Sequence, residues 1–293
     1  MVKFRVIPWI EVKGSNLIKG INMEGLRVLG APYRYSKFYS ENGADELIYY
    51  DVVASLYGRK SILDIISKTA EKTFIPITVC GGIRTLDDIK KILGAGADRV
   101  CLNSAAIQNP SLISKSAEVF GSSTICINIQ TTKDKKGNYF CYYNHGRELT
   151  NINVKDWAKK VEKKGAGEII LSSIDKEGSF EGIDINLLKT IRDIVKIPVI
   201  MHGGCNGPKN IVDAFNKIKF EGVAVASLFH YHLLKKFKQE ILKDFRTKDK
   251  NISEGNTEYL LNKNSVYNYI YENTLSVADF KNFLRKKNMN VRI

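Results

Sequence analysis

Two pairs of glycines are the sequence feature that points most directly to chemistry. Gly81-Gly82 and Gly203-Gly204 each follow a short apolar run that begins after an Ile-Pro dipeptide. Glycine lets backbone amides approach a ligand closely, and it adopts positive φ without a steric penalty. Amides gathered in this way bind anions. The alternative is that the glycines only form tight turns after two strands; their recurrence in pairs favours phosphate binding.

Two serines stand at corresponding positions after two other apolar runs. Ser104 follows Asn103, Ser227 follows Ala226, and each serine begins a segment with helical character. A hydroxyl at a helix N-terminus beside glycine amides completes an anion site. The sequence therefore predicts two phosphate sites, which suit a ligand with two phosphates or a single phosphate in either site.

Eight apolar segments must position these residues, and they alternate with amphipathic segments. The predicted strands cover residues 5–11, 46–51, 77–80, 99–103, 124–130, 168–172, 199–202 and 222–226. Helices are predicted at 86–93, 157–164 and 211–218, among others. Runs that are apolar at consecutive positions are typical of parallel strands covered by helices on both faces. Eight alternations predict an α/β fold, a single (β/α)₈ TIM barrel, with an open doubly wound sheet less favoured.

An internal repeat favours the closed barrel over the open sheet. Ile75-Pro76 and its glycine pair recur at Ile197-Pro198, 122 residues later, and Glu46 recurs as Glu168 at the same offset. A second half that repeats the first at this level predicts two half-barrels that close on each other.

Two segments interrupt the alternation. Residues 131–150 place a Lys-Gly-Asn turn between polar and aromatic residues, and we expect a hairpin over the barrel mouth. Residues 236–274 are rich in lysine, asparagine and tyrosine and precede the last predicted helix at 277–285. We expect them to form a surface insertion, partly helical, within one barrel domain of residues 1–293.

The composition excludes several classes of protein. The 293 residues are 44% apolar and 26% charged, as in a globular chain with a large core. No apolar run approaches the roughly 18 residues of a membrane span, and the N-terminus lacks a signal-peptide core. The formal charge of +14 comes from lysines that are spread along helical segments and crowd mainly in 233–250, without an interleaved aromatic motif. We therefore expect phosphorylated small molecules rather than nucleic acid or membrane as partners. Five cysteines without a Cys-x-x-Cys pair predict a reduced, cytoplasmic protein.

The histidines do not form a metal motif. His230 and His232 lack a third ligand, so we expect neither a metal nor another cofactor. His202 ends a predicted strand at the barrel mouth, where it either contacts a ligand or fills space.

The whole chain outside 236–274 resembles the cyclase subunit of imidazole glycerol phosphate synthase, a (β/α)₈ barrel of histidine biosynthesis. The matching stretches are IPWIEVKGSNLIKG, KFYSENGADELIYYDVVAS, ITVCGGIRT, GADRVCLNSAAIQNPSLI, WAKKVEKKGAGEIILSSIDKEG, VIMHGG, VAVASLFH and NMNVRI. The residues that the resemblance implies in phosphate binding are Gly82, Asn103 and Ser104 at one site, Gly203, Gly204, Ala226 and Ser227 at the other, and Lys19 in the loop after the first strand.

The resemblance also implies a catalytic pair that this sequence changes. The family uses two aspartates as general acid and base, and the matching positions hold Glu11 and Gln130. Glutamate moves its carboxylate by one methylene, and a misplacement of about 1 Å can cost about 10²-fold in rate. Glutamine transfers no proton near neutral pH. The alternative is that Asp51 or Asp175 supplies the missing carboxylate.

A further implication concerns the other end of the barrel. In the family, a separate glutaminase subunit releases ammonia, which enters the barrel through a ring of charged residues. The matching residues here begin predicted strands: Arg5, Glu46, Arg99 and Glu168. The alternative is that they form ion pairs for stability alone. Asp98 matches a residue that faces the glutaminase.

These features together favour a barrel subunit that receives ammonia but no longer performs the histidine-pathway cyclisation efficiently. Altered members of the family resemble proteins of bacterial surface-sugar clusters, in which ammonia passes to an N-acetyl sugar amidotransferase. The first alternative is a working imidazole glycerol phosphate synthase cyclase, a lyase. The second is a non-catalytic module that binds a phosphorylated sugar.

Overall fold

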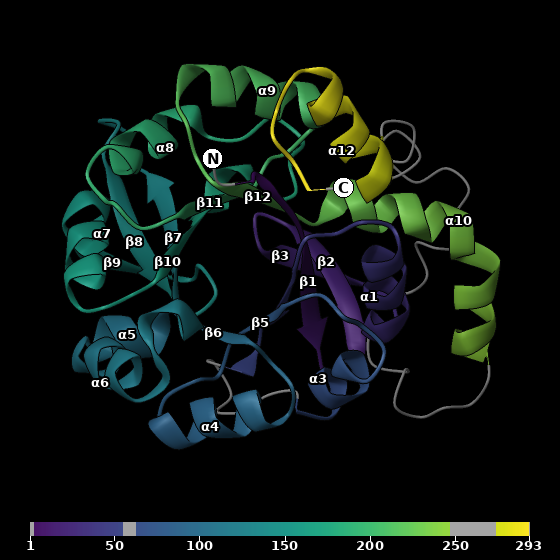
Figure 1. Ribbon diagram of the computed structural model, residues 1–293, viewed down its shortest axis with the longest axis horizontal. Helices are drawn as coiled ribbons and strands as arrows, with labels where there is room; N and C mark the ends of the chain where they lie inside the picture. Colours follow the sequence, from purple (N-terminus) through teal and green to yellow (C-terminus); the bar gives the residue numbers. More distant parts are fainter. Residues whose placement is uncertain (1–2, 55–62, 247–273, 293) are drawn as a thin grey trace.

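The computed structural model describes residues 3–54, 63–246 and 274–292, and only the backbone of 241–246. Eight parallel strands in this part of the chain form a barrel (Figure 1). In order, they are β1 (Arg5–Lys13), β4 (Leu47–Asp51), β5 (Ile77–Cys80), β6 (Arg99–Leu102), β7 (Ile125–Lys133), β10 (Glu168–Ser173), β11 (Val199–His202) and β12 (Gly222–Val225). β12 pairs in parallel with β1, so the barrel is closed. The predicted (β/α)₈ barrel is confirmed, and the open sheet is excluded.

Helices surround the barrel and cover its outer face (Figure 1). They are α1 (Pro32–Glu41), α3 (Leu63–Ala70), α4 (Leu86–Gly94), α5 (Ser104–Gln108), α6 (Ser111–Phe120), α7 (Val154–Lys163), α8 (Ile185–Arg192), α9 (Pro208–Lys217), α10 (Ser227–Arg246) and α12 (Val277–Lys286). Local sequence explains where several of them begin. Thr85 and Asp88, for example, form a reciprocal capping box at the start of α4.

The strands divide the core into two layers, because successive side chains point to opposite faces. One layer lies between strands and helices and includes Ile127 and Ile129 of β7. The other fills the inside of the barrel with apolar side chains that include Ile7, Ile48, Cys80, Cys101, Cys126, Ile170 and Ile200. All five cysteines are buried free thiols.

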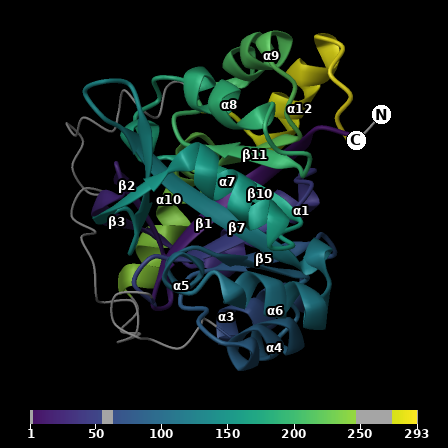
Figure 2. The same ribbon diagram turned by 90° about the vertical axis from the view of Figure 1, so that its left-hand side faces the viewer.

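Two hairpins extend the barrel at the ends of β1 and β7. The hairpin expected within 131–150 is present: β7 continues to Lys133 and pairs with β8 (Tyr139–Tyr143), which pairs with β9 (Glu148–Asn153). The hairpin of β2 (Asn16–Ile21) and β3 (Glu24–Gly30) was not predicted. Glycines interrupt its apolar pattern, and pairing with β1 gives it a partner that local sequence does not reveal. Figure 2 shows β2 and β3 at the end of the barrel opposite the chain termini.

The segment predicted as an insertion begins inside a helix. α10 runs from Ser227 to Arg246, so residues 236–246 continue the helix that starts after β12. Residues 247–273 lie outside the described residues. The predicted final helix is present as α12. Among the described residues, no helix has both the length and the apolar character needed to cross a membrane.

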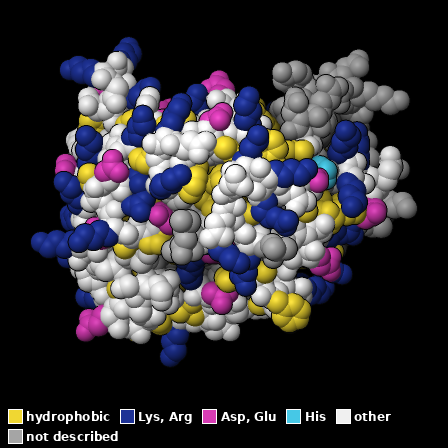
Figure 3. Space-filling view, turned by 45° about the horizontal axis from the view of Figure 1, so that its top comes forward, with side chains coloured by type: hydrophobic (Ala, Val, Ile, Leu, Met, Phe, Trp, Pro, Cys, Tyr) yellow, Lys and Arg dark blue, Asp and Glu magenta, His cyan; other side chains and the backbone are white. Residues whose placement is uncertain are grey.

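Basic side chains are dispersed on one face of the molecule. On the face shown in Figure 3, lysine and arginine side chains are separated by acidic, apolar and uncharged groups, with no continuous basic patch. On this face, the lysines and arginines are therefore spread out rather than gathered in one place.

Candidate active site at the mouth of the barrel

Three buried charged residues form a cluster at the carboxyl end of β1. Lys19 of β2 places its Nζ 2.7 Å from Oε2 of Glu11 and forms a second ion pair with Glu177. The other carboxylate oxygen of Glu177 accepts a hydrogen bond from the backbone N–H of Met23 at 2.8 Å. All three charged side chains are nearly inaccessible to solvent. One ammonium group therefore lies between two carboxylates in a dry environment.

This arrangement changes the acidity of Glu11. Burial raises the pKa of Glu11 to about 7, although Lys19 acts in the opposite direction. Burial acts to lower the pKa of Lys19, but the two carboxylates outweigh it and raise that pKa. A carboxyl group with a pKa near neutrality is able both to hold and to release a proton at working pH. Glu11 is thus chemically suited to proton transfer.

Gln130 makes hydrogen bonds at both ends of its amide. Its Oε1 accepts from Asn103 Nδ2 at 2.8 Å and from the backbone N–H of Gly146 at 3.1 Å. Its Nε2 donates to the hydroxyl of Tyr50 at 2.9 Å. The Tyr50 hydroxyl lies 3.0 Å from Nδ1 of His145, and burial lowers the pKa of that histidine to about 3. Gln130 therefore belongs to a neutral, oriented network and carries no proton-transfer group.

The two predicted phosphate sites open into hollows of different size. Gly82, Asn103 and Ser104 line a cavity of about 340 Å³, here called the mouth cavity, with Arg84 also in its lining. The second hollow holds only about 20 Å³, and its lining includes Gly203, Gly204, Ala226, Ser227, His202 and Glu177. The described structure thus offers ligand-sized space at the first site.

The glycine pairs also serve the turns themselves. Gly81 has φ +99°, and a Cβ there would lie 2.3 Å from the carbonyl oxygen of Asp51. Gly204 has φ +83°, and its Cβ would lie 2.3 Å from the carbonyl oxygen of Gly182. Both positions require glycine for backbone reasons alone. The tight turns therefore account for these two glycines, although Gly81 and Gly82 both line the mouth cavity and Gly204 lines the second hollow.

The two aspartates considered as substitutes both accept hydrogen bonds from backbone N–H groups. Oδ1 of Asp51 accepts from the backbone N–H groups of Val53 and Ala54, both at 3.1 Å. Asp175 is exposed, and its Oδ2 accepts from the backbone N–H of Lys133 at 2.9 Å. Asp51 ends β4 directly after Tyr50, whose hydroxyl accepts from Gln130. The structure also brings Glu177, which was not among the predicted residues, to Lys19.

His202 and His230 form hydrogen bonds within the core. Nδ1 of His202 lies 3.2 Å from Oγ of Ser172, and its ring stacks on Trp9 with centroids 4.2 Å apart. His230 is fully buried between the hydroxyl of Tyr39 and the backbone carbonyl of Trp9.

Four charged residues form a closed ring at the opposite end of the barrel, here called the floor ring. Arg5 pairs with Glu46 at 2.7 Å and also with Glu168. Arg99 pairs with Glu168 at 3.0 Å and with Glu46 at 2.5 Å. Burial acts to lower the pKa of both guanidinium groups, but neighbouring groups, the two glutamates among them, outweigh it and raise it. Charges alternate around the ring and sum to zero.

Asp98 lies beside this ring at the surface. It is exposed, and its Oδ2 accepts from the backbone N–H of Ile77 at 2.8 Å, at the start of β5. The side chain thus helps to begin a strand while its charge remains open to solvent.

Comparison with known proteins assigns the family. The profile described as "Histidine biosynthesis protein" matches residues 5–235. The chain belongs to this histidine biosynthesis family. Its relatives include proteins named imidazole glycerol phosphate synthase subunit HisF. The chain is 50% identical over 204 residues to the one from Legionella pneumophila, covering 70% of this chain and 96% of the relative. It is 44% identical over 231 residues to the one from Staphylococcus saprophyticus, covering 78% and 92%.

A third HisF relative, from Lactococcus lactis, is 41% identical over 247 residues, which is 83% of this chain and 95% of the relative. The family match ends at residue 235, so the whole segment predicted as an insertion, 236–274, lies beyond it. The family resemblance inferred from sequence motifs is therefore confirmed.

Sequence reasoning missed three residues of the site. Glu177 follows Asp175 by two positions, and a test of both acidic residues in that stretch would have included it. Tyr50 shares the inward face of its strand with Ile48, so the period of two was an available signal. His145 reaches the mouth because the turn between β8 and β9 folds back over the mouth. No local sequence pattern predicts this fold.

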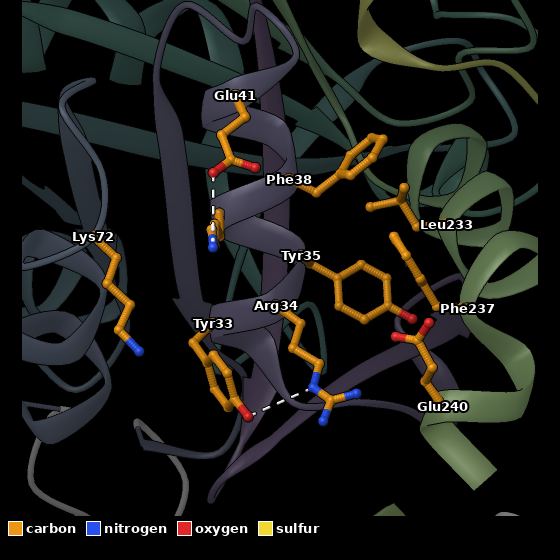
Figure 4. A pocket seen from close by; sticks show the side chains of 10 residues that line it. Tyr33, Arg34, Tyr35, Phe38, Glu41, Lys72, Leu233, Phe237 and Glu240 are labelled. Carbon is orange, nitrogen blue, oxygen red and sulfur yellow. Dashed lines mark hydrogen bonds and ion pairs between the residues drawn. The ribbon is translucent and has the colours of Figure 1, made fainter. Parts of the chain in front are cut away.

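A separate hollow of about 880 Å³ lies outside the barrel wall, between α1 and α10 (Figure 4). Aromatic side chains from both helices and charged side chains line it, and none of the predicted site residues does. Its position away from the strand ends separates it from the candidate active site.

Proposed function

We propose that this chain is the barrel subunit of a glutamine amidotransferase of the imidazole glycerol phosphate synthase type. A separate glutaminase subunit supplies ammonia at the floor ring, and the ammonia is used or passed on at the mouth. The observation that carries the proposal is the presence, at opposite ends of one barrel, of a neutral ring of four charges and a buried carboxyl group with a pKa near 7. Free buried thiols are consistent with a reduced, cytoplasmic setting.

The cyclase reaction of histidine biosynthesis is the first candidate for the chemistry at the mouth. The names of the relatives favour it. In this role Glu11 would transfer protons, Lys19 would hold the Glu11 carboxylate in place, and the glycine-serine sites would bind the phosphates of the substrate. With a single titratable carboxyl group at the two positions of the catalytic pair, the rate is expected to be low.

The supply of ammonia to an N-acetyl sugar amidotransferase is the second candidate. One observation favours it: Gln130 stands where the cyclase needs an acid, and both ends of its amide are already hydrogen-bonded. An ammonia-delivering barrel needs the floor ring and the glutaminase surface but no second carboxylate at the mouth.

A coupled assay with the cognate glutaminase separates the two candidates. The full chain is mixed with that glutaminase, glutamine and the histidine-pathway substrate; complex formation, glutamate and imidazole glycerol phosphate are then measured. Complex formation with cyclised product supports the first candidate, and complex formation without product supports the second. Failure to bind any glutaminase encoded beside the gene would contradict the proposal itself.

A further inference from the structure

Two asparagines leave unpaired polar atoms at the mouth cavity. Asn128 of β7 and Asn103, which follows β6, both line this cavity. Residues Leu102 and Ile127 are partners in the β6–β7 ladder, so the two asparagines occupy the next position on adjacent strands. Nδ2 of Asn128 and Oδ1 of Asn103 are buried and have no hydrogen-bond partner among the described residues. Buried polar atoms are rarely left in this condition without a role.

The orientation of Asn103 is determined by a backbone group. The N–H of Gly146 donates to Oε1 of Gln130, which fixes that oxygen, and Asn103 must therefore present Nδ2 to it. Oδ1 of Asn103 is consequently the atom without a partner. It offers a hydrogen-bond acceptor at the mouth cavity.

The orientation of Asn128 is supported by a chain of neutral groups. The Ser172 hydroxyl donates to Oδ1 of Asn128 at 2.8 Å, and Nδ1 of His202 lies 3.2 Å from the same hydroxyl oxygen. His202 in turn stacks on Trp9. Burial lowers the pKa of His202 to about 3, so the chain carries no charge at working pH. Asn128 is 1% exposed and presents Nδ2 as a donor.

Charge is confined to the rim of the mouth cavity. Arg84 is the charged side chain among the described residues that line it, and Arg84 is exposed. A charged ligand group deep in the cavity would lose its hydration without a partner, which is costly. A phosphate is therefore suited to the rim, near Gly82 and Ser104, and an uncharged group to the interior. The volume of about 340 Å³ lies within the range of small-ligand sites.

We propose that the mouth cavity binds a small phosphorylated ligand whose inner end carries an uncharged group that both accepts and donates a hydrogen bond, a carboxamide or a hydroxyl. Asn128 donates to this group and Asn103 accepts from it. Ser172 and His202 are positioning residues that hold the amide of Asn128. The inference rests on the phosphate site of the proposed function, and it adds the residue that recognises the rest of the ligand.

Calorimetric titration tests the proposal with four probes: inorganic phosphate, glucose 1-phosphate, N-acetylglucosamine 1-phosphate and glucosamine 1-phosphate. At least one of the two neutral sugar phosphates is expected to bind the full chain more tightly than inorganic phosphate. Asn128→Leu, of similar size but without a donor, should weaken that binding about 10-fold, as expected for one lost hydrogen bond in a buried site. Asn186→Leu makes the same change at an exposed position of α8 and should leave binding unchanged.

Ser172→Ala supplies a second test that does not alter the recognising side chain. The substitution should weaken binding of the sugar phosphate and leave binding of inorganic phosphate unchanged. A general loss of structure would not produce this selective effect. Preference for the N-acetyl probe assigns a carboxamide, and equal or better binding of glucose 1-phosphate assigns a hydroxyl. Unchanged affinity in both Asn128→Leu and Ser172→Ala, or tightest binding of cationic glucosamine 1-phosphate, would overturn the proposal. If sugar binding depends on Asn128 but does not compete with inorganic phosphate, the result would contradict the phosphate site of the proposed function and keep the role of Asn128.

Discussion

At the scale of single residues, the candidate catalytic pair has become asymmetric. Glu11 sits in a buried cluster that raises its pKa to about 7, a value suited to proton transfer. Gln130 stands on the facing side of the mouth in a network of neutral hydrogen bonds with Asn103 and Tyr50. The first group gained proton affinity from burial, whereas the second has no proton to exchange. A reaction at this mouth that needs both an acid and a base at these two positions therefore lacks one proton-transfer group.

Replacing Gln130 by aspartate tests the missing partner. We expect the wild-type chain with its glutaminase to form imidazole glycerol phosphate slowly, and Gln130→Asp to raise that rate by at least about 10-fold, part of the about 10²–10⁴-fold that a proton-transfer group supplies. Gln130→Asn is the matched control, because it has the length of aspartate but no acid. Equal rates in the wild type and Gln130→Asp would contradict this expectation and leave Glu11 as a sufficient catalyst.

The raised pKa of Glu11 also predicts a dependence of stability on pH. The folded state holds a proton on Glu11 that the unfolded state releases between about pH 4.5 and 7. The contribution of Glu11 to the free energy of unfolding therefore falls as pH rises through this window, by up to about 3 kcal/mol. Glu11→Gln should lack this fall, because an amide does not titrate in this range. Lys19 keeps its ion pair with Glu177 in that variant.

Urea denaturation at several pH values between 4.5 and 8 measures this effect. Glu118→Gln, at an exposed position of α6, is the control and should follow the wild type. A wild-type slope retained in Glu11→Gln would assign the pH dependence to another group.

The sequence was informative about residues on the strands and less so about residues brought in by turns. Inward-facing positions such as Arg99 follow from the period of two along a strand. His145 and Glu177 lie on irregular segments, and their place at the mouth depends on how two hairpins and a short turn pack together. Such contacts are set by tertiary packing and leave no periodic pattern in the chain.

At the scale of elements, the parallel strands were predictable because each is a short apolar run buried on both faces. The pattern of β5 is an example, with all four residues buried. The β2–β3 hairpin escaped prediction because its glycines divide it into pieces and its pairing with β1 is a longer-range contact. It nevertheless carries Lys19, so the element that local sequence reveals least is the one that positions a central residue of the site.

Asp98, in the loop before β6, allows a structural role to be separated from the proposed role in glutaminase binding. Its carboxylate accepts from the N–H of Ile77, while its charge faces solvent next to the floor ring. Asp98→Asn keeps an acceptor and should retain the glutaminase with reduced affinity. Asp98→Lys reverses the charge and should abolish co-purification, whereas Ser104→Ala at the mouth should have no effect. Loss of the complex with Ser104→Ala and not with Asp98→Lys would mean that the glutaminase binds the opposite face.

At the scale of the whole molecule, the barrel separates charge from apolar space along its axis. The floor ring closes one end, side chains such as Ile48, Ile170 and Cys101 fill the middle, and the polar residues of the mouth occupy the other end. The side chains described in this middle layer offer an ammonium ion no counter-charge, whereas neutral ammonia crosses an apolar layer at lower cost. A barrel of this construction is suited to passing ammonia and excluding ions.

Glu46→Ala tests whether the floor ring controls that passage. Glu46 pairs with both arginines of the ring, so its removal leaves one uncompensated positive charge at a largely buried position. The loss of a buried partner costs up to about 3–5 kcal/mol, less where water enters, and we expect a lower free energy of unfolding by urea. In complex with the glutaminase, the variant should release free ammonia, so that glutamate formed per product rises above the wild-type ratio. Glu118→Ala should change neither quantity. If Glu46→Ala loses stability but keeps the wild-type ratio, the ring serves the fold alone and ammonia enters by another route.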